Sequence, residues 1–393
     1  MGKRPVARPP SAPPTIALML QGGGALGAYH IGAYQALAEQ GLHPDWVSGI
    51  SIGAVNAAVI AGNPPDDRVD RLAALWESIS WPDLPAPVTA RLWQTLHNMA
   101  SNAEALLLGQ PNFFTLRPVS PYLRPPSPPQ EVSFYDTTPL RLTLRRFADF
   151  ALINRGAVRL SLGATNLATG VLEFFDNGRQ ALGPQHVLAS CSLPPGFPAT
   201  VVDGTPYWDG GCVSNTPLDA VIDEPCYPRM VVFLIDLWDA AGPPPETINE
   251  VLWRAKQIQY ASRTAHHVDA VATKVNLRHA LRLLQAAGAP QVAAVPLDAV
   301  PAIERLDIVH IVYRPETGVI ANSDAEFSRS SIAERRAAGY RDMQAALAAQ
   351  PWLRQELPAH LGALVHRVER GVVATRPEPD LGTLSDGAHI SRG

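Results

Sequence analysis

The sequence predicts an α/β fold of three layers, in which helices cover both faces of a mainly parallel β-sheet. Two observations support this prediction. A strand, helix, strand pattern runs from Thr15 to Gly62, and the segment Arg229–Leu237 is almost entirely apolar. Such a run is typical of a parallel strand buried on both faces, and parallel strands need crossover segments to connect them. At 393 residues the chain is long enough for one large domain or for two.

The strand, helix, strand pattern defines the first four elements. The first strand is Ile16–Leu20 and the crossover helix is Ala25–Gln40. The second strand ends just before Gly49, and the second helix is Ala54–Ile60. Gly41 is a suitable stop for the crossover helix. Because a right-handed crossover puts the carboxyl ends of both strands at one edge of the sheet, the loops Gly22–Gly24 and Gly49–Gly53 are expected to lie side by side.

The later elements follow from periodicity and from turn residues. Helices are predicted over residues 69–80, 136–154, 181–192, from Asn215 onward, over 246–287 as one helix or a helical hairpin, and over 330–350. Strands are predicted over 158–164 and 170–175 as a hairpin, over 201–211 as two strands with a turn, and over 229–237 and 307–313. Residues 81–130 are a proline-rich insertion with a helical stretch at 88–108, interpreted either as a lid over the site or as packed loop.

Charge and hydropathy exclude several classes of protein. With 32 basic and 36 acidic residues the net charge is −4, which does not favour binding to nucleic acid. No apolar stretch approaches the roughly 20 residues of a membrane-spanning helix, so a soluble or peripheral protein is expected. The basic residues of 246–287 are interpreted as a solvated face, with peripheral contact to anionic lipid as the alternative.

The cysteines indicate a reducing compartment. Cys191, Cys212 and Cys226 are odd in number and lack the spacing of metal ligands or of a disulfide framework. We therefore expect a cytoplasmic protein. Because no potential ligands cluster in the sequence, no metal or organic cofactor is expected, although the sequence does not decide against calcium.

Ser51 is the candidate nucleophile. It lies in Gly49-Ile50-Ser51-Ile52-Gly53 between a strand and a helix, where Gly49 and Gly53 admit the tight turn of a nucleophile elbow. The helix that follows would direct its positive end at the Ser51 hydroxyl. Gly22-Gly23-Gly24 can turn successive amide N–H groups toward one point, as an oxyanion hole requires.

Two other interpretations of these glycines stay open. Gly22, Gly24 and Gly27 also match the G-x-G-x-x-G pattern of a dinucleotide-binding oxidoreductase of the Rossmann type. That class needs an acidic residue at the end of the second strand, whereas Asp45 stands at its start. The other interpretation is an accidental G-x-S-x-G in a binding or scaffold protein without catalysis. The presence of serine, aspartate and glycines together disfavours it.

A serine hydroxyl needs a base to accept its proton, and the sequence offers histidines and one distinctive acid. The histidines that come late enough in the chain are His266, His267, His279, His310, His360, His366 and His389. None of them lies in a glycine-marked loop. Asp209 does, at the end of a predicted strand and before Gly210 and Gly211, where it could face Ser51 across the sheet edge. Burial in an apolar mouth would raise the pKa of this carboxyl and make it a better base.

The motifs G-G-G-A-L-G, G-I-S-I-G and D-G-G, in this order and spacing, resemble those of the patatin-like phospholipase family. The resemblance covers about residues 14–240 and implies a patatin-like α/β/α fold with a Ser-Asp dyad and no histidine. Ser51 would be the nucleophile, Asp209 its base, and the amides around Gly22, Gly23, Gly24 and Ala25 the oxyanion hole. It also implies that Gly27, Gly49, Gly53, Gly210 and Gly211 are motif glycines.

The resemblance divides the chain into four parts. They are a disordered arm over 1–13, a patatin-like catalytic domain over 14–240, a mostly helical extension over 241–370, and a flexible tail over 371–393. The segment that begins at His310 is similar to a C-terminal domain of unknown function in one bacterial branch of the family.

The expected activity is hydrolysis of carboxylic esters of lipids, as in a phospholipase or lipid acyl hydrolase. Hydroxyacid polyesters or oligomers are the alternative substrate, because few charges are predicted near the mouth of the site. Many family members have arginine where this chain has Leu26, so a preference for phosphate-bearing lipids stays open. The oligomeric state is not predicted.

Overall fold

The computed structural model describes residues 13–81, 109–222, 227–290, 303–315, 323–354 and 361–376. The strands are β1 (Thr15–Leu20), β2 (Trp46–Gly49), β3 (Thr115–Leu116), β4 (Tyr135–Asp136), β5 (Arg159–Asn166), β6 (Leu172–Asp176), β7 (Thr200–Val202), β8 (Thr205–Asp209), β9 (Tyr227–Asp236), β10 (Ile303–Val312), β11 (Ala363–Glu369) and β12 (Val372–Arg376). All but β3 and β4 belong to one sheet, in the order β12-β11-β10-β9-β1-β2-β5-β8-β7, with β6 paired to β5.

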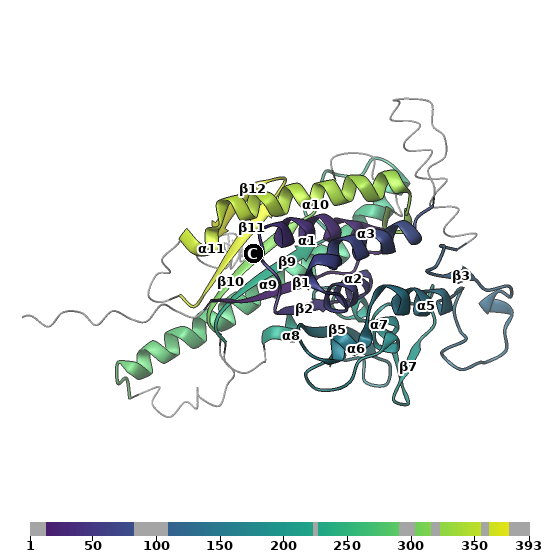
Figure 1. Cartoon of the computed structure of the whole chain (residues 1–393), viewed down its shortest axis with the longest axis horizontal. Coiled ribbons are helices and arrows are strands. Elements are labelled where there is room, and N and C mark those ends of the chain that lie inside the picture. The colour runs from purple at the N-terminus through teal and green to yellow at the C-terminus, as the bar shows by residue number, and fades with distance from the viewer. Residues whose placement is uncertain are drawn as a thin grey trace, which may run out of the picture.

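The helices lie between and around these strands (Figure 1). The α-helices are α1 (Tyr29–Glu39), α2 (Ile52–Ala61), α3 (Arg68–Ser78), α5 (Thr138–Phe147), α6 (Phe150–Asn154), α7 (Pro184–Ser190), α8 (Asp219–Ile222), α9 (Ile248–Ala286), α10 (Arg329–Ala349) and α11 (Pro351–Arg354). The short 3₁₀ helices are η1 (Gly24–Ala28), η2 (Pro65–Asp67), η3 (Pro121–Leu123), η4 (Gly210–Cys212) and η6 (Ser323–Ala325).

The centre of the sheet is parallel and its margins are antiparallel. Strands β11, β10, β9, β1, β2 and β5 all pair in parallel, one with the next. The antiparallel pairs are β11 with β12, β5 with β6 and β8, and β7 with β8. The mainly parallel sheet and the hairpin of β5 and β6 are therefore confirmed.

The sheet is buried on both faces, which gives the fold its three layers. Side chains alternate along a strand, so Leu18 and Leu20 of β1 face one core while Ala17 and Met19 face another. The first core packs against α1, α2, α3 and α10, and the second against α8 and α9. Figure 1 shows α1, α3 and α10 on one side of the strands and α9 on the other.

Several predicted helices differ in their bounds, among them the crossover helix and the helix over 136–154. The crossover helix starts at Tyr29 instead of Ala25, because Gly24 has a φ of +54° and the chain first makes the 3₁₀ turn η1. The helix predicted over 136–154 is divided into α5 and α6, since the Asp149 side chain caps α6 by accepting hydrogen bonds from two amides. Residues 246–287, which the sequence left open, contain one continuous helix, α9.

The C-terminal part of the chain differs most from its prediction. The segment over 241–370, predicted to be mostly helical, contributes β10, which confirms the strand predicted over 307–313, and also β11, which was not predicted. Residues 372–376, predicted to lie in a flexible tail, form β12, which pairs with β11 across a turn at Arg370 and Gly371. The N-terminal arm up to residue 12, the helix predicted at 88–108 and residues 377–393 lie outside the described residues. No helix in the described part of the chain is long and apolar enough to cross a bilayer.

Candidate active site

The parallel strands bring the predicted site residues to one edge of the sheet. At this edge Leu20 of β1 is in register with Gly49 of β2 and with Ile235 of β9. The loops that follow these residues therefore begin next to one another. Strand β8 runs in the opposite direction and ends at Asp209, opposite Ala164 of β5. Residues far apart in the sequence thus meet at the carboxyl edge of the parallel strands.

Ser51 has the backbone of a strained turn. Its φ of 56° and ψ of −126° are rare for a residue with a side chain. A Cβ atom on Gly49 would overlap the Gly53 carbonyl, and one on Gly53 would overlap the Leu20 carbonyl. The Ser51 amide donates to the carbonyl and hydroxyl oxygens of Ser190, each at 3.1 Å. This close packing holds the turn in place at the start of α2.

Asp209 is a buried carboxyl, only 1% exposed. Its Oδ1 atom accepts a hydrogen bond of 2.7 Å from the Gly211 amide. Burial raises the pKa of Asp209 to about 7. Hydrogen bonds from the Ser51 side chain and the Gly211 amide lower this pKa and offset part of the effect of burial. Its Oδ2 atom is buried and makes no hydrogen bond of good geometry within the described residues. Loose catalytic hydrogen bonds are usual before substrate binds.

The glycine loop is oriented through the carbonyl of Gly22. This oxygen accepts hydrogen bonds from Asn215 Nδ2 at 2.7 Å and from Trp238 Nε1 at 2.9 Å. In a trans peptide the N–H of Gly23 points away from that carbonyl. No hydrogen bond from the amides of Gly23 and Gly24 is made within the described residues. These two N–H groups are therefore available as donors, as are those of Gly22 and Ala25, which also make no such bond within the described residues.

The loop approaches Ser51 closely because it lacks side chains. A Cβ atom on Gly22 would lie 2.9 Å from Ser51 Cβ and would overlap the Asn215 side chain. Gly22, Gly23 and Gly24 line the same cavity as Ser51 and Asp209. Ala25 is fully buried and is not among the lining residues.

The remaining motif glycines permit close packing behind the cavity. A Cβ atom on Gly27 would lie 2.7 Å from the Ile52 side chain, and one on Gly210 would lie 2.7 Å from the Gly163 carbonyl. Gly211 lines the cavity and donates its amide to Asp209.

The shared cavity has a volume of about 630 Å³ and a largely aromatic wall. The aromatic lining residues are Phe113, Phe114, Phe134, Tyr135, Phe197, Trp238, Tyr260 and Phe327. Phe113 and Phe114 come from the described end of the proline-rich insertion, so that part of it forms a wall of the site. Whether the insertion acts as a lid depends on the helix predicted at 88–108, which lies outside the described residues.

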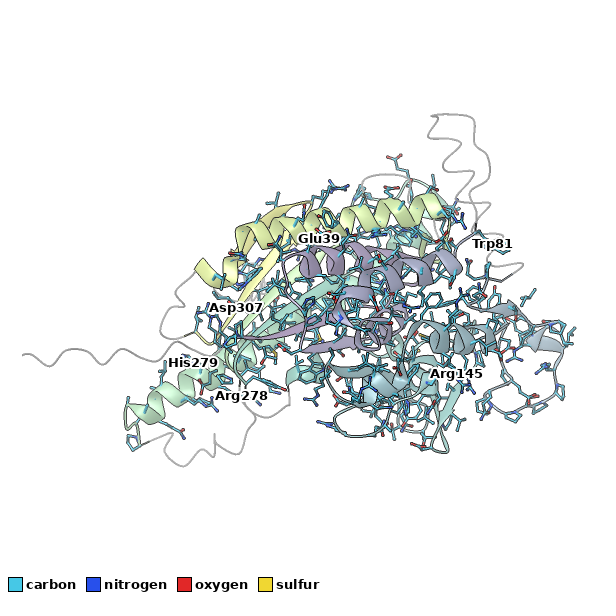
Figure 2. All side chains as sticks on the ribbon, in the orientation of Figure 1. Glu39, Trp81, Arg145, Arg278, His279 and Asp307 are labelled. Carbon is cyan, nitrogen blue, oxygen red and sulfur yellow. The ribbon has the colours of Figure 1, made fainter. Side chains whose placement is uncertain are left out.

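No histidine is among the described residues that line this cavity. His310 bonds Asp236, and His366 bonds Asp307, at 3.0 and 3.1 Å. Figure 2 shows Asp307 and His279 at the opposite end of the molecule from Trp81. The Trp81 amide bonds Phe327, a wall residue of the cavity. Asp209 lines this cavity and its carboxyl interacts with the Ser51 side chain.

A charged pair also lines the cavity. Lys256 of α9 contacts both carboxylate oxygens of Asp324 at 2.9 and 3.0 Å. Leu26, where many family members have arginine, is buried in the core. Lys256 therefore supplies a cation to the cavity wall from α9, far along the sequence from Leu26.

Several residues around the cavity were not identified as site residues from the sequence. Ser190 holds the turn of Ser51, and Asn215 and Trp238 hold the Gly22 carbonyl. Asn215 follows D-G-G by four residues, and Trp238 follows β9 by two. For Asn215 and Trp238, this position after motif elements was the only signal.

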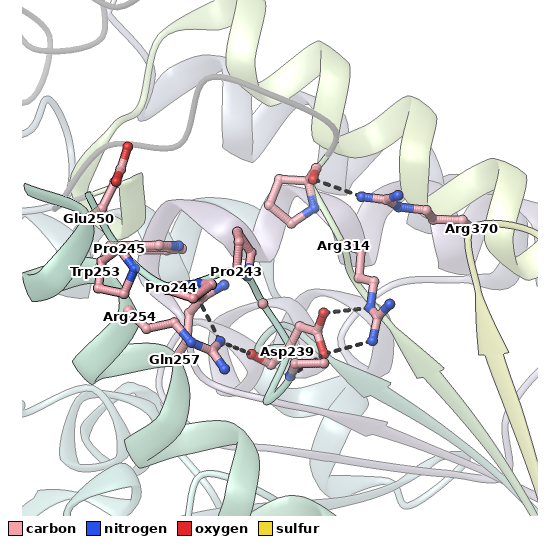
Figure 3. Close-up of a pocket in the computed structure, with 13 residues that line it drawn as sticks. Asp239, Pro243, Pro244, Pro245, Glu250, Trp253, Arg254, Gln257, Arg314 and Arg370 are labelled. Atoms are coloured by element: carbon pink, nitrogen blue, oxygen red, sulfur yellow. Dashed lines mark hydrogen bonds and ion pairs between the residues drawn. The ribbon is translucent and has the colours of Figure 1, made fainter. Parts of the chain in front are cut away.

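A second cavity, of about 390 Å³, lies beside the segment that carries Trp238 (Figure 3). Arg314 forms an ion pair with Asp239, and Arg254 donates to the carbonyls of Asp239 and Ala240. Arg254 thus connects the segment after β9 to α9, and Arg314 connects it to the residues that follow β10. They therefore support Trp238 against the glycine loop.

The structure disfavours a dinucleotide site. Asp45 lies at the amino end of β2, where its carboxylate accepts a hydrogen bond of 2.8 Å from the Ile16 amide. The carboxyl end of β2 leads into Gly49 and Ser51, without an acidic residue. Among the described residues, no three His, Cys, Asp or Glu side chains gather as metal ligands.

The fold and the site together define a class of protein: an α/β/α protein with a serine at a strained turn and a buried carboxyl in one apolar cavity. The profile described as patatin-like phospholipase matches residues 18–222, and the chain belongs to this family. A second profile, described as patatin phospholipase, matches residues 258–359 and confirms the additional C-terminal domain.

Curated relatives match part of this chain. The chain is 27% identical over 230 residues to Lysophospholipase NTE1 of Kluyveromyces lactis, which is 56% of this chain and 12% of that protein. It is 43% identical over 82 residues to human patatin-like phospholipase domain-containing protein 6, 19% of this chain and 6% of that protein. The chain thus spans a small part of the length of these relatives.

Solved structures also show similarity. VipD from Legionella pneumophila aligns with a TM-score of 0.37 and 18% identity, over 86% of this chain and 68% of VipD. The complex of SpcU with ExoU from Pseudomonas aeruginosa aligns with a TM-score of 0.28 and 20% identity, over 63% of this chain and 50% of the matched chain.

Proposed function

We propose that this protein hydrolyses carboxylic ester bonds of lipids, with Ser51 as the nucleophile and Asp209 as its general base. One observation carries the proposal: Ser51, on its strained turn, shares an apolar cavity with a buried carboxyl whose pKa is raised to about 7. A base whose pKa lies near neutrality can both accept and return a proton at that pH.

The reaction has two halves. Asp209 accepts the hydroxyl proton while Ser51 Oγ bonds to the acyl carbon, and the carbonyl oxygen becomes an oxyanion that the amides of Gly23 and Gly24 stabilise. When the tetrahedral intermediate collapses, the bond to the alcohol breaks and Asp209 returns the proton to the leaving oxygen. Water then attacks the acyl-enzyme, Asp209 accepts one of its protons, and the fatty acid leaves as Ser51 recovers its hydroxyl.

The aromatic wall favours an acyl chain as the group bound beside Ser51. The cavity has the size of a small-molecule site and is lined mainly by apolar side chains. Polar groups concentrate at Ser51, Asp209 and the pair of Lys256 with Asp324. A substrate with an apolar tail and a polar head would match both regions.

Hydrolysis of p-nitrophenyl esters of increasing chain length tests this function. We expect kcat/KM to rise with chain length, and a fluorophosphonate probe to label Ser51. Oligomeric hydroxyacid esters in the same assay test the alternative substrate. A thermal shift with NAD or FAD, without ester hydrolysis at any chain length, would instead support the dinucleotide-binding class.

We also propose that the cavity opens toward a lipid surface through the loop of η3. Tyr122 and Leu123 are 86% and 80% exposed, and the Tyr122 ring packs against Phe134, which lines the cavity. An exposed apolar loop that is continuous with a lipid cavity is suited to inserting into a membrane surface.

Sedimentation with phospholipid vesicles tests this surface. Replacing Tyr122 and Leu123 by Ser is expected to weaken binding about tenfold or more, because a buried Leu contributes roughly 1.5–3 kcal/mol. Hydrolysis of short, soluble esters should be unchanged. Val372→Ser, an exposed valine on β12, is the matched control. Equal vesicle binding by all three proteins would contradict the proposal.

A further inference from the structure

A buried arginine of the C-terminal domain contacts the glycine loop directly. Arg335 of α10 is 6% exposed. Its Nη1 atom donates to the Ala25 carbonyl at 3.0 Å and to the Glu326 carbonyl at 2.8 Å. Its Nη2 atom donates to the Ser323 carbonyl at 3.0 Å and lies 3.4 Å from the Glu326 carboxylate. One guanidinium thus joins the residue after Gly24 to the segment around η6.

The segment around η6 in turn shapes Gly24. The Asp324 carbonyl occupies the space that a Cβ atom on Gly24 would need. Lys256 of α9 holds the Asp324 carboxylate on its other side. The glycine loop is therefore enclosed between the Gly22 carbonyl, which Asn215 and Trp238 hold, and the Ala25 carbonyl, which Arg335 holds.

Arginine is chemically suited to this position. Its planar guanidinium offers donors in several fixed directions, whereas a lysine ammonium is a compact charge at the end of a flexible stem. A lysine could pair with the Glu326 carboxylate but could not reach three carbonyls in the same geometry. Buried carbonyls that lose their donor are destabilised, and the loop would move to find new partners.

We propose that Arg335 is a positioning residue of the oxyanion hole, supplied by the C-terminal domain. It keeps the amides of Gly23 and Gly24 directed at the oxygen that becomes negative in the transition state. This inference rests on the proposed function. Arg335 does not touch the substrate, so its loss should affect the transition state far more than substrate binding.

Two substitutions and two matched controls test the proposal. Arg335→Lys keeps the charge, and Arg335→Met keeps much of the apolar stem. The controls are Arg336→Lys and Arg336→Met, one residue further along α10. Arg336 connects α10 to α1: its Nε and Nη2 atoms donate to Gln35 Oε1 at 3.2 and 2.8 Å. It makes no hydrogen bond to the glycine loop within the described residues.

We expect Arg335→Lys to lower kcat about 10- to 100-fold with KM nearly unchanged, because a small misplacement of oxyanion donors has effects of this size. The inhibition constant of a trifluoromethyl ketone, which forms a tetrahedral adduct with the serine, should rise by a similar factor. That of a chain-matched fatty alcohol should not change. Arg335→Met should show the same pattern more strongly, and both Arg336 variants should resemble wild type.

The proposal fails if Arg335→Lys matches Arg336→Lys in kcat, or if its affinities for the ketone and the alcohol fall together. Should Arg335→Met not fold, Arg335→Lys, checked by its melting temperature and circular dichroism, decides the matter alone. Failure of the proposed function would look different, since wild type itself would then lack ester hydrolysis and the ketone would not bind Ser51.

Discussion

Replacing Ser51 by Ala is expected to lower kcat for ester hydrolysis by about 10⁴-fold or more, the size of loss seen when a catalytic serine is removed. The variant side chain would have no oxygen to form the acyl-enzyme, while the wall of the cavity would be intact. Initial rates with a p-nitrophenyl ester, over a range of substrate concentrations, measure the loss. Binding of a fatty alcohol should stay within a few-fold of wild type.

Ser78→Ala is the control for this substitution, because within the described part of the chain the Ser78 hydroxyl bonds only the Leu75 carbonyl of its own helix. It should leave kcat unchanged. A rate for Ser51→Ala within tenfold of wild type would remove Ser51 from the mechanism. The double variant with Asp209→Asn should be no slower than Ser51→Ala alone, since the two residues are proposed to act in one step.

Replacing Asp209 by Asn is expected to have opposite effects on activity and stability. The amide cannot accept the proton of Ser51, so kcat should fall by about 10³-fold or more. In the wild type, kcat/KM should rise with pH and level off above about pH 7, because only the ionised carboxylate is a base. Asp66→Asn, at an exposed acid in η2, should change neither property.

The effect on stability follows from the raised pKa. The folded carboxyl, with its pKa raised from 3.8 to about 7, holds its proton in a pH range where the unfolded one has lost it. Stability therefore falls as pH rises through this window, and the full penalty applies above about pH 7. At about 1.4 kcal/mol per pH unit, Asp209→Asn should raise the free energy of unfolding by up to about 4 kcal/mol at pH 8.

Urea denaturation at pH 8 and pH 4 measures this difference, which should nearly vanish at the lower pH. Destabilisation by Asp209→Asn at pH 8 would mean that the carboxylate is stabilised by contacts other than those described here. A wild-type pH profile that is flat between pH 5 and pH 8 would contradict the role of Asp209 as base.

Features that depend on local sequence were predictable, whereas those that depend on distant contacts were not. The turn at Ser51 and the loop at Gly22–Gly24 need glycine for local reasons, so the glycine motifs in the sequence predict both. Asp209 was selected because it alone among the candidate bases lies in a glycine-marked loop. The structure brings it into one cavity with Ser51.

Arg335 and Trp238 could not be identified in this way. Each side chain donates a hydrogen bond to a backbone carbonyl more than 200 residues away, and the sequence around it does not indicate that contact. The strands β11 and β12 were missed because polar residues interrupt their apolar pattern. His366, for example, is buried in β11, where Asp307 on β10 and Thr375 on β12 bond its two ring nitrogens.

The order of strands also determines when the protein can fold. Strand β1 lies between β2, which follows it closely, and β9, where Thr15 is in register with Met230. During synthesis β1 therefore leaves the ribosome long before its second neighbour exists. The N–H and C=O groups of that edge lack strand partners until more than 200 further residues have been made. Such distant pairing slows folding and exposes an unpaired strand to other chains. A nascent chain of this protein would accordingly keep one edge of β1 exposed until β9 has been made.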